Sequence, residues 1–243
     1  MTPAVIPIAD LSSALELGDR ELVSLVGGGG KTTALFALGR QLTGTVILST
    51  STKMGSDRTG GHHPLIAPSA HGLATALARH RVVLAWKGVK DHRALGFDVD
   101  ECADFARLAD HVVIEADGSR RKPFKAPADH EPVVPGATTV LIACVGAAAF
   151  DAPISASCHR PESVAEVAGC RPDDRLRPDR LAAVLTSNRG SRKGCPPTAR
   201  FVVLLNQVTD GHRSFVEELC GHLGDDVPVV AVAPFAPEDS PEA

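Results

Sequence analysis

The stretch Val26-Gly27-Gly28-Gly29-Gly30-Lys31-Thr32-Thr33 decides the fold. It directly follows an apolar, strand-like run, and after it apolar residues recur at helical spacing as far as Leu42. Consecutive glycines allow the backbone to approach a polyphosphate closely and to point N–H groups at its oxygen atoms. A strand, a glycine loop ending in Gly-Lys-Thr and a helix together predict a P-loop, with phosphate at the helix N-terminus.

The polar residues of this loop have predicted roles. Lys31 supplies a positive charge for the β and γ phosphates, and we expect that charge to be exposed and unpaired without ligand. Thr32 supplies a hydroxyl that can bind Mg²⁺. The amides of residues 27–30 and of Thr33 would surround the phosphates.

The loop departs from the strict pattern at one position. That pattern has a glycine five residues before Gly30, where this chain has Leu25, so we expect a shortened or variant loop. A flexible turn without ligand is one alternative. A dinucleotide-binding turn is a weaker one, because Thr32 stands where its third glycine belongs and Lys31 has no role in it.

The composition indicates a globular protein. The 243 residues are 44% hydrophobic and carry a formal net charge of -4. These values suit a single P-loop-like α/β domain over residues 1–243 and do not favour a nucleic-acid binder. The sequence shows neither a basic apolar leader nor an apolar run long enough to cross a bilayer, so we expect a cytoplasmic protein without a membrane partner.

Apolar runs alternate with helical patterns through most of the chain. The predicted strands are Leu22–Val26, Thr45–Leu48, Val82–Ala85, His111–Ile114, Thr139–Cys144, Phe201–Leu205 and Val229–Val232. The predicted helices are Thr32–Leu42, Ala70–His80, Glu101–Leu108, Arg180–Leu185 and His212–His222. This alternation predicts a doubly wound, mainly parallel α/β sheet of the P-loop NTPase type, with ligands at the carboxyl ends of its strands.

Three long segments interrupt the alternation. Residues 51–64 are polar and rich in glycine, and residues 117–135 contain four prolines and several charges. Long ordered loops at strand ends are usually functional. Residues 186–197 are basic and rich in Gly, Ser and Pro, so we expect them to be exposed. We expect the Pro- and Glu-rich tail from Pro234 to fray.

Two carboxylates end the apolar run His111-Val-Val-Ile-Glu115-Ala-Asp117-Gly118. Glu115 and Asp117 face the same side if the strand continues, so both could serve one metal ion. In P-loop proteins a carboxylate at the end of a neighbouring strand holds Mg²⁺ or its waters. We predict Thr32 and Asp117 as metal ligands, with Glu115 as a further ligand or as the group that positions a water. Lys31, Glu115 and Asp117 are then the catalytic candidates. A plain acidic loop is the alternative.

A basic segment follows these carboxylates. It reads Ser119-Arg120-Arg121-Lys122-Pro123-Phe124-Lys125. Arg120, Arg121 and Lys125 are the predicted clamp for an anionic substrate or for the triphosphate. A solvated, self-neutralising surface is an equally good interpretation. His130 and Glu131 are candidates for proton transfer or further substrate contacts, although a structural turn would explain them as well.

Two further strand ends carry polar residues. The run Leu48-Ser-Thr-Ser-Thr-Lys53 places hydroxyls and a lysine where phosphate or Mg²⁺ contacts are expected. The run Leu205-Asn206-Gln207-Val-Thr-Asp210 is similar to the Asn-Lys-x-Asp with which GTPases read guanine, but Gln207 replaces the lysine and the acid is one residue late. We predict Lys53 and Asn206 as nucleotide-binding residues and leave the base, ATP or GTP, open.

The six cysteines lack the spacing of zinc ligands. We expect them to be small buried or half-buried residues in a reducing compartment. Cys158 stands beside His159 and Arg160, which could lower the pKa of its thiol, but we favour a packing role for it as well.

Several motifs together resemble one known family. They are Gly-Gly-Gly-Gly-Lys-Thr-Thr at 27–33, Ser-Thr-Ser-Thr-Lys-Met at 49–54, Ile-Glu-Ala-Asp-Gly-Ser at 114–119, Lys-Ala-Pro-Ala-Asp-His-Glu-Pro at 125–132, His-Arg-Pro-Glu at 159–162 and Leu-Asn-Gln-Val at 205–208. The chain resembles the YqeC-like family from about Gly18 to Val232, most distinctively over 115–132. Ser49 and Ser51 stand where that family usually shows threonines.

This resemblance implies a pathway more firmly than a reaction. The family is described as accessory proteins of selenium-dependent molybdenum hydroxylases, or as selenium-cofactor biosynthesis proteins. We therefore expect an Mg²⁺-dependent NTPase whose partners are a nucleotide and such a hydroxylase or its maturation proteins. The alternatives are a kinase or nucleotidyltransferase acting on a small anionic substrate, and a non-catalytic switch that binds nucleotide to control a partner protein.

Overall fold

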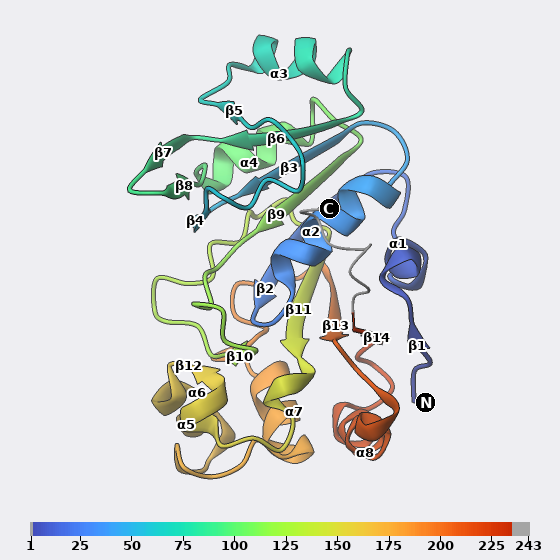
Figure 1. Cartoon of the computed structure of the whole chain (residues 1–243), viewed down its shortest axis with the longest axis vertical. Coiled ribbons are helices and arrows are strands. Elements are labelled where there is room, and N and C mark those ends of the chain that lie inside the picture. The colour runs from blue at the N-terminus through green and yellow to red at the C-terminus, as the bar shows by residue number, and fades with distance from the viewer. Residues whose placement is uncertain (1, 235–243) are drawn as a thin grey trace.

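The structure, a computed structural model, describes residues 2–234 and is built on a nine-stranded sheet (Figure 1). The strand order is β1-β14-β13-β11-β2-β9-β3-β6-β5. Every neighbouring pair in this sheet is parallel. The strands are β1 (Val5–Ile6), β2 (Glu21–Gly27), β3 (Val46–Thr50), β5 (Leu65–Ile66), β6 (Val82–Trp86), β9 (His111–Glu115), β11 (Val140–Gly146), β13 (Arg200–Asn206) and β14 (Val229–Val232). The prediction of a mainly parallel α/β sheet is confirmed.

All seven predicted strands are present, and the two unpredicted strands of the sheet lie at its edges. β1 and β5 are two residues long, too short to show any periodicity. Two small sheets were also not predicted. One is antiparallel, in the order β4 (Lys53–Gly55), β8 (Arg93–Leu95), β7 (Gly88–Lys90), and the other is the parallel pair β10 (Phe124–Lys125) and β12 (Cys158–His159).

The helices occupy both faces of the sheet and its carboxyl end. They are α1 (Leu11–Ala14), α2 (Lys31–Gln41), α3 (Ala70–Leu77), α4 (Val99–Phe105), α5 (Ile154–Ser157), α6 (Pro161–Ala168), α7 (Pro178–Thr186) and α8 (Arg213–Leu223), with 3-10 turns at Ile8–Asp10, Ala147–Ala149 and Asp210–His212. The five predicted helices are all found. α4 begins before its predicted start because Asp98 and Glu101 form a capping box, which makes Glu101 the third residue of the helix.

Helices cover both faces of the sheet, which makes it doubly wound, and alternate residues of each strand pack against opposite layers. Ile142 of β11 belongs to the apolar core with α1 and α2, including Leu35. Leu141 and Ala143 belong to a second core with α7 and α8. A third core joins β3, β6 and β9 to α3 and α4. Because helices cover both faces, the strands are continuous apolar runs.

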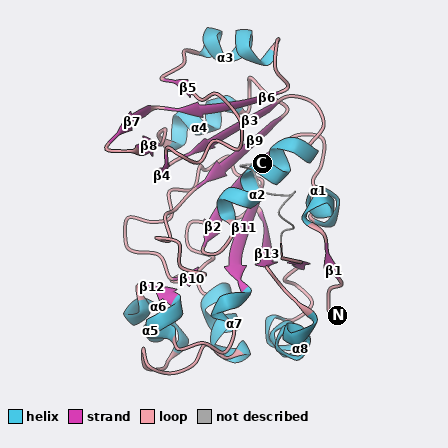
Figure 2. Cartoon of the chain, viewed as in Figure 1, coloured by secondary structure: helices cyan, strands magenta, loops and turns pink. Residues whose placement is uncertain are grey.

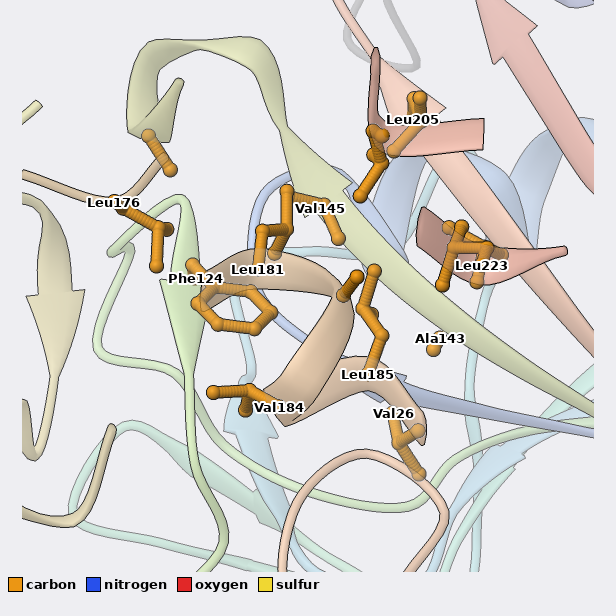
Figure 3. Close-up of a cluster of buried hydrophobic side chains, with 14 of the residues drawn as sticks. Val26, Phe124, Ala143, Val145, Leu176, Leu181, Val184, Leu185, Leu205 and Leu223 are labelled. Carbon is orange, nitrogen blue, oxygen red and sulfur yellow. The ribbon is translucent and has the colours of Figure 1, made fainter. Parts of the chain in front are cut away.

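The second core extends past the carboxyl end of the sheet and includes segments that the sequence indicated only as loops. Phe124, Leu176 and Leu181 pack there with Val145 from the end of β11 (Figure 3). Figure 2 shows that the chain between β9 and β11 is mostly loop, yet it passes beneath the sheet beside α5 and α6. Phe124 and Ala126 of the segment 117–135 are therefore part of the core, and Val134 packs against it.

The expectation that residues 186–197 are exposed is wrong for part of this segment. Gly190 and Ser191 are buried, and Ser191 donates its N–H to the carbonyl of Val184. Lys193 Nζ donates to the carbonyls of Ala128 and Asp129. The segment is held by long-range contacts that its composition could not reveal. The predicted frayed tail lies, after Pro234, outside the described residues.

No helix within residues 2–234 combines the length and the apolar content needed to cross a bilayer.

The packing of the helical layer predicts the effect of a single truncation. Leu181 is fully buried in α7, so Leu181→Ala should lower the free energy of unfolding by about 2–5 kcal/mol through lost burial and the cavity left behind. Urea denaturation would measure this. Ala183→Ser at an exposed position of the same helix is the control and should change stability by less than about 0.5 kcal/mol. A similarly small effect of Leu181→Ala would show that this layer is not part of the cooperative core.

Candidate functional site

The glycine loop lies at the point where the chain reverses its direction across the sheet. After β2 the chain builds β3, β6 and β9 on one side, and it later returns to place β11 on the other. In open parallel sheets, ligands bind at the carboxyl ends of the strands at such a point. β2 continues to Gly27 and α2 begins at Lys31, so the connection is only Gly28–Gly30. Leu25 is buried inside β2, in keeping with the shortened loop that its identity predicts.

The four glycines are required by packing within the protein. A Cβ at any of residues 27–30 would lie 2.4 to 2.6 Å from a heavy atom of another segment. Gly29, at φ +69°, lies against the backbone of Gly146, and Gly30, at φ +107°, lies against the side chain of Asn206. Both φ values are in the region that favours glycine. The glycines thus admit neighbouring segments of the protein, whereas the sequence predicted only the close approach of a phosphate.

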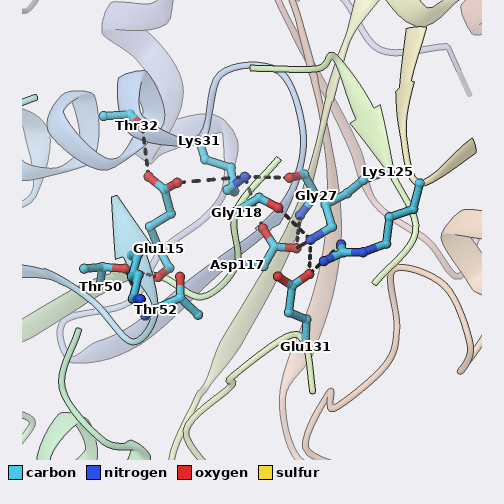
Figure 4. A network of polar contacts seen from close by, with 12 residues as sticks. Gly27, Lys31, Thr32, Thr50, Thr52, Glu115, Asp117, Gly118, Lys125 and Glu131 are labelled. Atoms are coloured by element: carbon cyan, nitrogen blue, oxygen red, sulfur yellow. Dashed lines mark hydrogen bonds and ion pairs between the residues drawn. The ribbon is translucent and has the colours of Figure 1, made fainter. Parts of the chain in front are cut away.

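Lys31 is buried and paired, contrary to the expectation of an exposed, unpaired charge. Its Nζ donates to the carbonyl of Gly27 at 2.5 Å and lies 3.1 Å from Asp117 Oδ1 and 3.9 Å from Glu115 Oε1 (Figure 4). Burial alone would lower the pKa of Lys31, but the Asp117 and Glu115 charges outweigh it and raise the pKa. Lys31 therefore carries its charge in the folded protein.

Glu115 forms a pair with the hydroxyl at the start of α2. Thr32 Oγ1 donates to Glu115 Oε2 at 2.8 Å, and Thr50 Oγ1 donates to the Glu115 carbonyl at 2.8 Å. Burial raises the pKa of the Glu115 carboxyl, against the lowering effects of Lys31 and of the Thr32 hydrogen bond. A hydroxyl and a carboxylate in contact are hard oxygen donors of the kind that Mg²⁺ accepts.

Asp117 is held between two lysines rather than beside Thr32. Its Oδ2 accepts the N–H of Gly27 at 3.0 Å and lies 3.2 Å from Lys125 Nζ, while its Oδ1 faces Lys31. Lys31 Nζ thus contacts both carboxylates. Among the described residues no group of three or more His, Cys, Asp or Glu side chains is arranged to hold a metal ion. These contacts favour Glu115 over Asp117 as the metal ligand, and the metal site stays a prediction.

Lys125 continues the ion pairs away from the loop. It is 1% exposed, and its Nζ donates to Glu131 Oε2 at 2.5 Å and to the Gly118 carbonyl at 2.8 Å. Arg160 donates to the same Glu131 oxygen at 2.8 Å. Burial would raise the pKa of Glu131, but the hydrogen bonds and charges of Lys125 and Arg160 lower it to about 2. Lys31, Asp117, Lys125, Glu131 and Arg160 therefore form a continuous series of ion pairs, which we call the charge series.

The structure does not bring every predicted residue into this group. Arg120 and Arg121 are exposed, and their side chains make no hydrogen bond or ion pair with the described residues. His130 is exposed, with its Nε2 4.0 Å from Glu131 Oε1. Lys53 is exposed on β4, in the small antiparallel sheet. Because none of these four residues contacts Lys31, their predicted roles stay predictions.

Asn206 does reach the loop. Its Nδ2 donates to the Gly29 carbonyl at 2.8 Å, and its buried Oδ1 has no hydrogen-bond partner among the described residues. Asn206 lies at the end of β13 and fixes the loop from the side opposite to Asp117. Its predicted contact with nucleotide stays a prediction, and its observed contact is structural.

Sequence reasoning missed Arg160 as a site residue. Its only signal was its place in the His-Arg-Pro-Glu motif, because it lies 29 residues from its partner Glu131. The reactive alternative for Cys158 is disfavoured, since burial raises the pKa of that thiol to about 11.

The glycine loop is packed against protein on the side of Asp117 and Lys125, and it is open to solvent on the side of the α2 N-terminus. Asp117 and Lys125 line a cavity of about 10 Å³ with Gly190 and Ser191, far too small for a nucleotide. By contrast, Gly29, Gly30, Thr32 and Thr33 are half-buried. The backbone N–H groups from 29 to 33 make no hydrogen bonds with other described residues. The N-terminus of α2 therefore presents free donors to solvent.

Comparison with known proteins places this α/β protein, with its glycine loop and paired carboxylates, in a family. The model of the family "YqeC protein" matches residues 23–162, more than half of the chain. The chain is also 30% identical over 197 residues to "Uncharacterized protein YqeC" of Escherichia coli (strain K12), which covers 76% of this chain and 75% of that protein. The chain belongs to the YqeC family. Every member of the charge series lies within residues 23–162.

The depressed pKa of Glu131 predicts a pH-dependent stability. A carboxyl whose folded pKa is lowered from 4.5 to about 2 stabilises the protein fully above pH 4.5, and this contribution is lost as the pH falls toward 2. Glu131→Gln should therefore destabilise the protein at neutral pH, and the difference from wild type should shrink as the pH falls below about 4.5. Urea unfolding of both proteins at a series of pH values measures it.

Glu162→Gln, at an exposed glutamate two residues after Arg160, is the matched control and should show little change at any pH. A Glu131→Gln deficit that stays constant from neutral to acidic pH would contradict the ion-pair origin of the stabilisation.

Proposed function

We propose that this protein binds a nucleoside triphosphate with Mg²⁺ at the N-terminus of α2 and acts as an NTPase. The observation that carries this proposal is the charged Lys31 beside the half-buried, uncapped start of α2, next to the Thr32–Glu115 pair. Free helix N-terminal amides and a lysine charge are complementary to phosphate oxygens. The base, ATP or GTP, is left open by the contacts.

The residues of the loop suit the phosphates. The free N–H groups from 29 to 33 would hold phosphate oxygens, and Lys31, only 3.1 Å from Asp117, would exchange this carboxylate for phosphate. That exchange needs only movement of a flexible side chain. It would also leave Asp117 paired with Lys125 and Gly27, so that the carboxylate does not become an isolated buried charge.

The donor set suits Mg²⁺ as well. Thr32 and Glu115 offer adjacent oxygen atoms, and Mg²⁺ in nucleotide sites typically takes one or two carboxylate or hydroxyl ligands and keeps several waters. A bound Mg²⁺ would neutralise phosphate charge and polarise the phosphoryl oxygens. Glu115 and Thr32 would hold it, while Asp117 orients Lys31.

The pathway in which this site acts is a second part of the proposal. From what the resemblance to the YqeC-like family implies, we propose a role in maturing a selenium-dependent molybdenum hydroxylase, either on the enzyme itself or with its maturation proteins. Product analysis separates the possible reactions. Hydrolysis releases only phosphate and diphosphate nucleotide, group transfer yields a modified acceptor, and a switch turns over little without its partner.

Removal of the Lys31 charge tests the phosphate site. Lys31→Gln should weaken ATP or GTP binding at least about tenfold, because a charge-assisted contact of about 1.5–3 kcal/mol is lost. Isothermal titration calorimetry with Mg²⁺ measures it. Because Asp117 and Glu115 lose a buried partner, we also expect a stability loss of about 3–5 kcal/mol. Circular dichroism should therefore first show that the variant is folded at the titration temperature.

Lys90→Gln is the matched control, since Lys90 is exposed on β7. It should bind nucleotide as wild type does. Unchanged affinity in a folded Lys31→Gln variant would contradict the phosphate site.

A comparison of two carboxylate variants tests the metal assignment. Glu115→Gln should weaken nucleotide binding much more in Mg²⁺ than in EDTA, because it removes a charged ligand from the Thr32 side. Asp117→Asn should weaken binding similarly in both conditions, because Asp117 acts through Lys31 and the loop. Titrations of both variants with and without Mg²⁺ decide the matter. The reverse pattern would assign the metal to Asp117.

A further inference from the structure

The pair β10–β12 places two basic side chains side by side near the glycine loop. Lys125 is the register partner of His159 in this parallel pair, so both side chains leave the two strands on the same side. Arg160 follows at once and reaches Glu131. The backbone of residues 122–124, at the start of β10, packs against Gly28 of the glycine loop. Lys125 therefore lies on a strand that packs directly against the glycine loop, with His159 on the paired strand and Arg160 directly after it.

Arg120 adds a third cation to this group. It lies two residues after Gly118, whose carbonyl accepts a hydrogen bond from Lys125 Nζ at 2.8 Å, and its charge contributes to lowering the pKa of His159. Its exposed side chain makes no hydrogen bond or ion pair with the described residues. Arg120 at φ +50° and Arg160 at φ +58° both have a left-handed backbone, which non-glycine residues rarely adopt. Such conformations persist where surrounding structure enforces them, and they concentrate at functional sites.

The group has more positive than negative charge. Three cations, Arg160, Lys125 and Arg120, act on His159, and one carboxylate, Glu131, opposes them; Lys125 is also paired with Asp117. Burial first, and then these three cations, lower the pKa of His159, which favours the neutral imidazole. Glu131 is already shared by Lys125 and Arg160. The imidazole of His159 is half-buried among three cations and one carboxylate. An anion bound there would reduce the repulsion among these cations.

We propose that Arg120, His159 and Arg160 form a second anion site, distinct from the phosphate loop, that binds a small phosphate-like oxyanion. In the context of the proposed nucleotide-binding function, this anion is the substrate that accompanies the nucleotide. Lys125 separates the two sites, because it pairs with Asp117 at 3.2 Å on the loop side and with Glu131 at 2.5 Å on the other. The neutral His159 can donate an N–H to the anion, and the two arginines supply charge and directed donors.

Sulfate is the probe, because it is tetrahedral, stays doubly charged over the pH range needed and is not a nucleotide fragment. The pKa of His159 should rise on saturation with sodium sulfate, since a bound anion stabilises the imidazolium. Proton–carbon NMR of the histidine rings measures it, with His159→Asn to assign the signal. Sodium chloride at equal ionic strength controls for screening.

The variants separate this site from the loop. Arg120→Gln and Arg160→Gln should each weaken the sulfate effect at least about tenfold, whereas Lys31→Gln and the exposed control Arg79→Gln should not. If Arg160→Gln does not fold, Arg120→Gln decides, because Arg120 is exposed and makes no contact with the charge series.

Each outcome has a definite meaning. The second site would be overturned if the pKa of His159 did not rise to a plateau as sulfate is added. It would also be overturned if the rise were the same in Arg120→Gln as in the wild type. Loss of the effect in Lys31→Gln would place the anion at the loop and would also overturn it, leaving the nucleotide proposal intact. Sulfate binding that depends on Arg120, in a protein that binds no nucleotide, would retain the second site and refute the proposed function.

Discussion

The charge series is the interaction on which the rest of the site depends. Lys31, Asp117 and Lys125 are almost fully withdrawn from water and Glu131 is half-buried, and each lies within 3.2 Å of an opposite charge. A buried charge without a partner costs several kcal/mol, so these side chains can be buried only together. They come from α2, from the end of β9, from β10 and from the loop after it. The series therefore fixes the long segment after β9 against the carboxyl end of the sheet.

The glycine loop is constrained from three sides by the same arrangement. Asp117 accepts a hydrogen bond from Gly27, the carbonyl of Cys144 accepts one from Gly28, and Asn206 donates to Gly29. These contacts come from β9, β11 and β13, and they leave the N–H groups at the start of α2 free. A loop held in this way is organised before any ligand arrives, which reduces the entropy cost of binding.

The proposed nucleotide and anion sites lie on either side of the Asp117–Lys125 ion pair of the charge series. Asp117 contacts Lys31 on the loop side, and Lys125 links Asp117 to Glu131 and Arg160. The two proposed sites are therefore joined by direct ion pairs. This arrangement is compatible with a protein that handles two anionic ligands together.

The sequence by itself determined the parallel sheet, its seven main strands, the position of the glycine loop and the family, because long apolar runs and contiguous motifs are local signals. Tertiary structure decided the rest. Lys31 is buried only because carboxylates distant in sequence surround it, Lys125 is buried between Asp117 and Glu131 of its own segment, and Glu115 rather than Asp117 contacts Thr32. His159 and Arg160 join the site through β10 and β12, which are two residues long and leave no periodic pattern. The partners of a buried charge are set by chain topology, which no local pattern encodes.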